Sequence, residues 1–291
     1  MTSSPSTFTV KNAAVLGSGT MGHGIAHVAA VSGMHVCLYD INREAAERGL
    51  AHIQANLEKG VNKGKLSSDL RDQALSRITL TTSLEEATSD VQLVVEAAPE
   101  RLELKQSLFR QIGQFAPTDA IFGTNTSSLS ITQIASVCQH PERVLGMHFF
   151  NPPHILKLLE LIKTEHTSDQ ALAAAKSIGQ QMDRDLIVIN DSPGFATSRL
   201  GLVLGLEAIR MLEEGVGSAE DIDRAMELGY RHPMGPLRLT DLVGLDVRLA
   251  IAEYLNRELG GDRFSPPKLL QDLVQAGKLG KKTGEGFHKW D

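Results

Sequence analysis

The chain has 291 residues, 42% of them hydrophobic and 22% charged, which is typical of a globular protein with one large or two ordinary domains. Its net charge of −6 at pH 7 argues against a general binder of nucleic acids or of acidic membrane surfaces. No apolar run is long enough to cross a bilayer, and residues 1–9 lack the features of a signal peptide, so we expect a cytoplasmic protein. Because the two cysteines have no metal-binding or redox spacing, we expect no metal.

A glycine-rich turn near the N-terminus gives the first functional prediction. An apolar run over residues 13–16 leads into the turn GSGTMG at 17–22, and a helical pattern follows over residues 21–32. A second apolar run, over residues 34–39, ends at Asp40. This order of strand, G-x-G-x-x-G turn, helix, and strand with an acidic tip is the dinucleotide-binding fingerprint.

Each position in the fingerprint has a physical reason. Gly17 permits the tight turn, Gly19 lets backbone N–H groups approach a pyrophosphate, and Gly22 lets the helix lie close to the strand. The helix N-terminus presents partial positive charge to the phosphates. The Asp40 carboxylate can accept hydrogen bonds from the adenosine ribose and would repel a 2′-phosphate. The sequence therefore predicts NAD, contacted by Gly17, Gly19, Thr20, Met21, Gly22 and Asp40.

Helix and strand patterns then alternate as in a Rossmann-type, doubly wound and mostly parallel sheet. Expected helices span residues 44–59, 68–77, 83–87, 99–115, 131–138 and 169–182. Expected strands span residues 78–81, 91–97, 120–123, 144–150, 156–162 and 185–189. We assign residues 1–190 to this NAD-binding domain, with a helical hairpin inserted at about 43–77.

Strand patterns disappear after residue 190, which predicts an all-helical second domain over 191–291. Its expected helices span residues 199–215, 218–228, 236–259 and 266–276. They carry more apolar surface than a domain of this size can easily bury. We therefore expect the second domain to pack against the first and against a second subunit.

The corner between the two helices of the inserted hairpin is rich in lysine. Lys59, Lys63 and Lys65 fall within seven residues of a chain that is acidic overall. A solvated turn between helices explains such a run without any ligand. From the residues alone this is the favoured interpretation, and the alternative is a site for a phosphorylated ligand, whose phosphates mobile ammonium groups would suit as point charges.

A histidine and a glutamate are placed to face each other in a predicted hairpin. His148 and Glu160 each lie six residues from a turn centred on His154, so in an antiparallel register they are directly opposed. A carboxylate beside an imidazole fixes its tautomer and stabilises its charged form, which prepares a general base. A core histidine bound to a backbone carbonyl is the alternative. The NAD site and the polar strand end that contains Ser127 favour the catalytic interpretation.

Seven motifs in fixed order carry a family resemblance. They are GSGTMG (17–22), VVEAAPE (94–100), NTSSL (125–129), GMHFFNP (146–152), PGF (193–195), HPMGP (232–236) and GKKTGEGF (280–287). With them the chain resembles the 3-hydroxyacyl-CoA dehydrogenase family, particularly its bacterial 3-hydroxybutyryl-CoA members. The resemblance implies NAD-dependent oxidation of a short-chain (S)-3-hydroxyacyl-CoA to the 3-ketoacyl-CoA, its reverse, and a homodimer formed through the helical domain.

The resemblance also implies roles for individual residues. His148 would be the catalytic base with Glu160 as its partner, and Ser127 would hold the reacting oxygen. The family's remaining NAD positions are here Glu100, Lys105, Asn151 and Lys282, and Ser127 lies between substrate and cofactor. Lys63 falls on a position that contacts coenzyme A, which favours the ligand interpretation of the lysine corner, with Lys59 and Lys65 as helpers.

Two departures and two alternatives accompany this resemblance. Ser198 stands where the family usually has an asparagine before an arginine, and we include it as a substrate-side candidate whose shorter reach a water would fill. His154 stands where proline is more common. The alternatives are a dehydrogenase of a free hydroxy or sugar acid on the same scaffold, and a non-catalytic NAD-binding protein.

Overall fold

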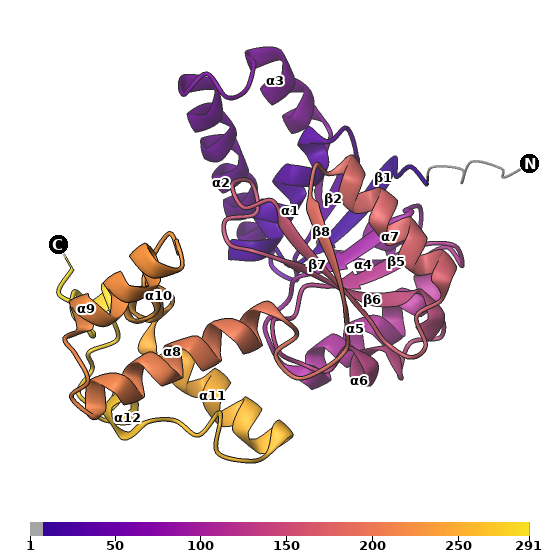
Figure 1. Ribbon diagram of the computed structural model, residues 1–291. Coiled ribbons are helices and arrows are strands. Elements are labelled where there is room, and N and C mark those ends of the chain that lie inside the picture. The colour runs from indigo at the N-terminus through magenta and orange to yellow at the C-terminus, as the bar shows by residue number, and fades with distance from the viewer. Residues whose placement is uncertain (1–7, 291) are drawn as a thin grey trace, which may run out of the picture. The chain divides into compact units, whose positions relative to one another are not determined.

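A computed structural model of the protein describes residues 8–290, and the chain divides into two compact units between Asp191 and Ser192. The first unit combines a sheet with helices, and the described part of the second is helical (Figure 1). The sequence predicts an α/β fold of this class followed by helices, and that prediction is confirmed.

Among the described residues, the first unit holds an eight-stranded sheet with the order β3-β2-β1-β4-β5-β6-β7-β8. Its strands are β1 (Asn12–Leu16), β2 (His35–Tyr39), β3 (Ile78–Thr81), β4 (Leu93–Glu96), β5 (Ile121–Thr124), β6 (Val144–Phe149), β7 (Leu158–Lys163) and β8 (Asp185–Asn190). Neighbouring strands are parallel except β6 and β7, which are antiparallel. The strand order reverses at β1, and doubly wound sheets bind ligands at the carboxyl ends of the strands beside such a reversal.

Helices cover both faces of this sheet. They are α1 (Thr20–Val31), α2 (Arg43–Asn62), α3 (Ser68–Ser76), α4 (Leu84–Thr88), α5 (Leu102–Phe115), α6 (Ile131–Ala135) and α7 (Asp169–Gln181), with a short 3₁₀ turn η1 (Pro141–Arg143) before β6. Val15 of β1 belongs to a buried cluster with Ile25 of α1 and Ile178 of α7. Leu16, the next residue along the strand, points to the opposite face and is equally buried.

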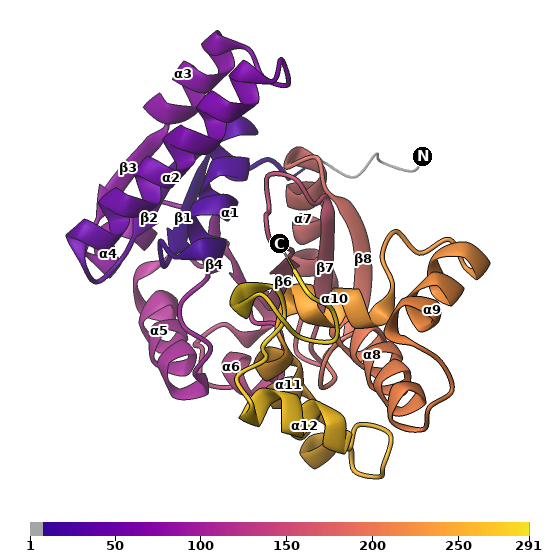
Figure 2. The ribbon, with the colours of Figure 1, turned by 90° about the vertical axis from the view of Figure 1, so that its left-hand side faces the viewer.

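The pair α2 and α3 forms the expected helical hairpin, which projects beyond the sheet (Figures 1 and 2). Asn42 caps the first helix, because its side-chain oxygen accepts hydrogen bonds from the backbone N–H groups of Glu44 and Ala45. Ile53 and Leu57 form part of the buried face of α2 and join the core of the first unit. The polar face of the helix is left to solvent.

The second unit is a cluster of helices around its own core. They are α8 (Thr197–Glu213), α9 (Ala219–Arg224), α10 (Pro236–Val243), α11 (Leu245–Leu259) and α12 (Lys268–Gln275), with the short helical turns η2 (Ala225–Gly229) and η3 (Lys281–Thr283). Leu206, Leu237 and Leu255 are among the buried residues at its centre. No helix among residues 8–290 combines the length and apolar content that crossing a bilayer requires.

One predicted helix of the second unit is wrong. The sequence pattern predicts a single helix over 236–259, but α10 ends at Val243 and α11 begins at Leu245. Gly244 between them has φ +106°, a conformation that residues with a side chain rarely adopt. The apolar pattern continues through the break, so helical periodicity alone does not reveal it.

Asp241 fixes the C-terminal segment to the second unit. Its carboxylate accepts hydrogen bonds of 2.8 to 2.9 Å from the backbone N–H groups of Phe287 and His288 and from Nε1 of Trp290. Three donors on one buried carboxylate hold the segment that contains Lys282 in a defined place.

His27 on α1 is an unusual core residue. It is 8% exposed, and its ring stacks on that of His154 with centroids 5.1 Å apart. Burial, with a smaller contribution from nearby basic groups such as His154, lowers the pKa of His27 to about 4. The folded protein therefore keeps this ring neutral at pH values where an unfolded chain would protonate it.

We expect His27 to weaken the fold as the pH falls from 6.5 toward 4. In that window the unfolded chain binds a proton that the folded chain does not, so acidification to about pH 4.5 should cost roughly 2 to 3 kcal/mol at this site. Urea unfolding at about pH 7 and about pH 4.5 measures the loss, and His27→Gln should reduce it by that amount. The same loss in both proteins would contradict the expectation.

Candidate active site

The glycine-rich turn lies at the carboxyl end of β1. Gly17 has φ +100°, and a Cβ added there would lie 2.7 Å from the Ala97 carbonyl oxygen. A Cβ on Gly22 would lie 1.7 Å from the carbonyl oxygen of Gly17, so α1 can begin this close to the strand only with glycine. A Cβ on Gly19 would meet nothing within 4 Å, so the turn is open to a ligand on that side.

Asp40 faces this turn from the end of β2. Its Oδ2 accepts hydrogen bonds from the backbone N–H of Ser18 at 3.0 Å and from its Oγ at 2.6 Å. A cavity of about 540 Å³ opens between the turn and the loop after β4. Its lining includes Gly17, Gly19, Thr20, Met21, Asp40, Ile41, Ala97, Ala98, Pro99 and Arg101. A glycine cradle, a carboxylate and apolar walls fit the adenosine and pyrophosphate of NAD.

A second cavity, of about 340 Å³, shares Met21, Ala97 and Ala98 with the first. Its lining also includes Glu100, Asn125, Ser127, His148, Phe149, Phe150 and Asn151. Four candidates that the sequence singles out at distant positions, Glu100, Ser127, His148 and Asn151, therefore meet in one place. The arrangement places the imidazole of His148 in a cavity that adjoins the one lined by the glycine-rich turn.

The predicted register of the hairpin is confirmed, because His148 of β6 pairs directly with Glu160 of β7. Nδ1 of His148 lies 2.7 Å from Oε2 of Glu160, and the two residues are 7% and 0% exposed. A carboxylate at Nδ1 keeps the proton on that nitrogen, so the lone pair of the neutral ring lies on Nε2. Such a ring can exchange a proton through Nε2.

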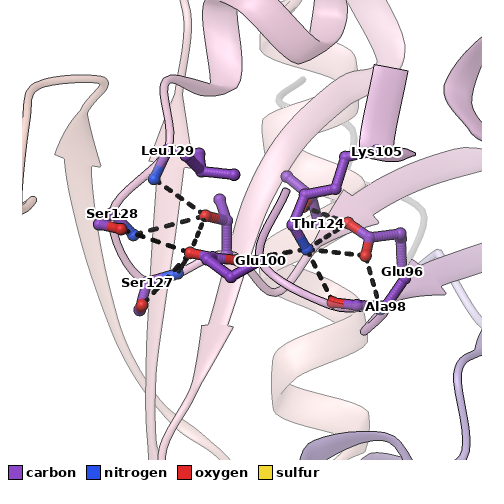
Figure 3. A network of polar contacts seen from close by, with 9 residues as sticks. Glu96, Ala98, Glu100, Lys105, Thr124, Ser127, Ser128 and Leu129 are labelled. Atoms are coloured by element: carbon purple, nitrogen blue, oxygen red, sulfur yellow. Dashed lines mark hydrogen bonds and ion pairs between the residues drawn. The ribbon is translucent and has the colours of Figure 1, made fainter. Parts of the chain in front are cut away.

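Glu100 holds the loop that follows β5 (Figure 3). Its Oε1 accepts hydrogen bonds from Oγ1 of Thr126 at 2.5 Å and from the backbone N–H of Ser127 at 2.9 Å. Burial acts to raise the pKa of Glu100, but the Lys105 ammonium and these donors outweigh it and lower the pKa. Glu100 is therefore a carboxylate that orders the backbone around Ser127.

Lys105 is more deeply buried than a ligand contact requires. Its side chain is 1% exposed, and Nζ lies 2.8 Å and 3.1 Å from the two carboxylate oxygens of Glu96. Nζ also lies 3.4 Å from Oε2 of Glu100. These contacts hold the ammonium between two carboxylates, and the expected contact of Lys105 with NAD stays a prediction. Glu96 is not among the site residues predicted from the sequence, although a glutamate that ends the apolar run of a buried strand is a visible signal.

The lysine corner lies at the tip of the hairpin of α2 and α3. Lys59 is in the last turn of α2 and Lys63 is its C-cap. All three lysines, including Lys65, are exposed, and none forms an ion pair with another described residue. Lys59 and Lys63 lie where a positive charge interacts favourably with the C-terminus of a helix. The ammonium groups of all three lysines are accessible to an anionic ligand.

Ser198 and Lys282 belong to the second unit, and their positions are described only relative to other residues of that unit. Ser198 is half-buried in the first turn of α8. Nζ of Lys282 donates to both carboxylate oxygens of Asp246, at 2.5 Å and 2.6 Å. The hydrogen bond from Lys282 lowers the pKa of Asp246. The roles expected for these two residues stay predictions.

Comparison with known proteins gives a consistent result. A family model described as "3-hydroxyacyl-CoA dehydrogenase, NAD binding domain" matches residues 12–192, and the model of the C-terminal domain matches residues 194–290. A probable 3-hydroxybutyryl-CoA dehydrogenase of Bacillus subtilis is 41% identical, over 97% of this chain and 98% of its own. The 3-hydroxybutyryl-CoA dehydrogenase of Bradyrhizobium diazoefficiens is 40% identical, over 97% and 96%. The crystal structure of (S)-3-hydroxybutyryl-CoA dehydrogenase from Ralstonia eutropha matches with a TM-score of 0.93 at 38% identity, covering 97% of this chain and 100% of that one.

Proposed function

The chain belongs to the 3-hydroxyacyl-CoA dehydrogenase family of NAD-dependent enzymes, and from that membership we propose that it interconverts (S)-3-hydroxyacyl-CoA and 3-ketoacyl-CoA. Short acyl groups such as 3-hydroxybutyryl are supported by the names of the similar proteins. The observation that carries the proposal is the cavity beside the cofactor turn that Ser127 and His148 line together.

The proposed chemistry assigns proton transfer to His148. When bound, NAD accepts the hydride that leaves C3 of the substrate. Nε2 of His148 takes the proton of the 3-hydroxyl group as the C–O bond becomes a carbonyl, and Ser127 holds that oxygen. Glu160, fully buried at Nδ1, stabilises the imidazolium that forms. In the reverse direction, the imidazolium returns the proton to the 3-keto oxygen.

The remaining candidates extend this assignment. We propose that Glu100, Asn151 and Lys282 act on the cofactor side, and that Ser198 acts on the substrate side through a water.

A cytoplasmic location is supported by the free thiols of Cys37 and Cys138, which suit a reducing compartment.

His148→Gln should lower kcat by about 1,000-fold, because the variant has no base to take the hydroxyl proton. Glu160→Gln should lower kcat by about 100-fold, since the imidazolium then forms without a buried counter-charge. The KM for NAD should stay within about twofold in both. Steady-state kinetics measure these values, with His140→Gln as the matched control outside both cavities. Full turnover by His148→Gln would overturn the assignment of His148 as the base. NAD binding without turnover in the unmodified protein would favour the non-catalytic alternative.

The substrate class is tested by nicotinamide absorbance during turnover of (S)-3-hydroxybutyryl-CoA with NAD, beside free 3-hydroxybutyrate and beside NADP. We expect kcat/KM for the thioester to exceed that for the free acid by at least about 100-fold, because the acid lacks the phosphates that the lysine corner would bind. The Asp40 carboxylate should disfavour NADP by about 100-fold. Comparable turnover of the free acid would instead support the hydroxy-acid alternative.

Lysine variants complete this test. Lys63→Met should raise the KM for the thioester by roughly tenfold and leave the KM for NAD unchanged, because it removes one charge-assisted contact to a phosphate. The effect should shrink at high salt, since exposed charges are screened. The matched control is Lys11→Met, because Lys11 is exposed and precedes β1, at the end of the strand opposite to the glycine-rich turn.

We propose a homodimer formed through the second unit. Large apolar side chains are exposed there, including Leu200, Leu204, Val216, Leu228, Tyr230, Leu239, Leu242, Val243 and Val247. So many exposed apolar groups are typical of an interface. Light scattering should give twice the 31.5 kDa mass of the chain. Leu204→Asp should reduce that mass and Val188→Asp, on the edge strand β8, should not; a monomer in the unmodified protein would overturn the proposal.

A further inference from the structure

Three charged groups, Glu96, Lys105 and Glu100, lie next to one another (Figure 3), and Glu100 lines the second cavity. Glu96 ends β4 and is fully buried, Lys105 on α5 is buried beside it, and Glu100 on the intervening loop has a side chain that is 39% exposed. Nζ of Lys105 lies between the two carboxylates, at 2.8 Å from Glu96 and 3.4 Å from Glu100. One ammonium group therefore serves two carboxylates.

Glu96 is saturated with donors. Besides the two contacts from Lys105, its carboxylate accepts hydrogen bonds from Oγ1 of Thr124 and from the backbone N–H of Ala98, both at 2.6 Å. A carboxylate offers about four acceptor positions, so Glu96 has no remaining capacity. A buried polar network in which every member is satisfied is rigid. Glu96 thus anchors the Lys105 ammonium in one place.

The anchored ammonium acts on Glu100 from the core side. The other side of Glu100 binds the loop after β5, through contacts to the side chain of Thr126 and to both the backbone N–H and Oγ of Ser127. Burial alone would raise the pKa of Glu100, and a protonated carboxyl would lose acceptor capacity toward Ser127. Lys105 is the charge that opposes this.

We propose that Lys105, anchored by Glu96, is a positioning residue that keeps Glu100 charged and hydrogen-bonded to Ser127, and that it does not itself contact the cofactor. Glu96 contributes to the reaction indirectly, because it fixes the position of the Lys105 ammonium group. The inference rests on the proposed function, because the position of Ser127 affects turnover only if the cavity is the reaction site.

The test separates stability from positioning. Lys105→Met alone leaves the Glu96 carboxylate buried without its counter-charge, so the melting temperature should fall by roughly 10 °C. The double variant Glu96→Gln with Lys105→Met removes both charges, and its melting temperature should return to within about 3 °C of the unmodified protein. Its kcat should nevertheless stay at least about tenfold low, because Glu100 has lost the ammonium that holds it.

The pH profile gives a readout that a structural ion pair would not move. Without Lys105 the pKa of Glu100 should rise, so the double variant should lose activity on acidification at a higher pH than the unmodified protein does. Glu100→Gln, a substitution at a partly exposed site that should not unfold the chain, mimics the protonated state. Glu100→Gln should show the same low kcat, but without the loss of activity on acidification that distinguishes the double variant.

Two results would overturn the inference. One is a double variant with both the melting temperature and the kcat profile of the unmodified protein. The other, which applies even if the double variant does not fold, is normal turnover by Glu100→Gln. The exposed pair Lys157 and Asp183, 2.6 Å apart, provides the control in Lys157→Met with Asp183→Asn. Failure of the proposed function would differ from both, because the unmodified protein would then not turn over the thioester.

Discussion

The approach of Gly22 to the carbonyl oxygen of Gly17 is the contact on which the rest of the first unit depends. An added Cβ would lie 1.7 Å from that oxygen, so the close start of α1 against β1 requires glycine. This start directs the free N–H groups of the first turn toward the carboxyl edge of the sheet. It also places Met21 in the lining of both cavities. The contact of Gly17 with Ala97 ties the same turn to the loop that carries Glu100.

Two buried carboxylates near this edge have partners of different kinds. Glu96 is paired with a lysine, whose charge is permanent at ordinary pH, and Glu160 is paired with a histidine, whose charge can change. A buried carboxylate must be compensated in either case. The permanent pair suits a fixed position, whereas the pair with His148 suits proton exchange, because a new imidazolium meets a carboxylate that water does not screen. One pair is therefore suited to hold the site and the other to react within it.

Local patterns predicted most of the fold and part of the site. The register of His148 on Glu160 could be counted from the turn between two apolar runs. The glycine-rich turn, where the sequence predicts NAD, lines the first cavity. The break at Gly244 could not be predicted, because the apolar pattern continues on both sides of it. The burial of the Lys105 side chain could not be predicted either. A lysine on an amphipathic helix is normally exposed, and this one is buried because Glu96, nine residues earlier, meets it on a neighbouring strand end.

The phosphate site proposed at the lysine corner is compatible with the acidic character of the whole chain. Exposed charges act over about 8 to 10 Å at physiological ionic strength, so a phosphate responds to the groups near it rather than to the net charge of −6. The hairpin of α2 and α3 projects beyond the sheet and carries Lys63 and Lys65 at its tip (Figure 1). The carboxylates of Asp40, Glu100 and Glu160 lie instead at the sheet edge. Because the hairpin projects beyond the sheet, the lysines at its tip and the carboxylates at the sheet edge occupy different parts of the first unit (Figure 1).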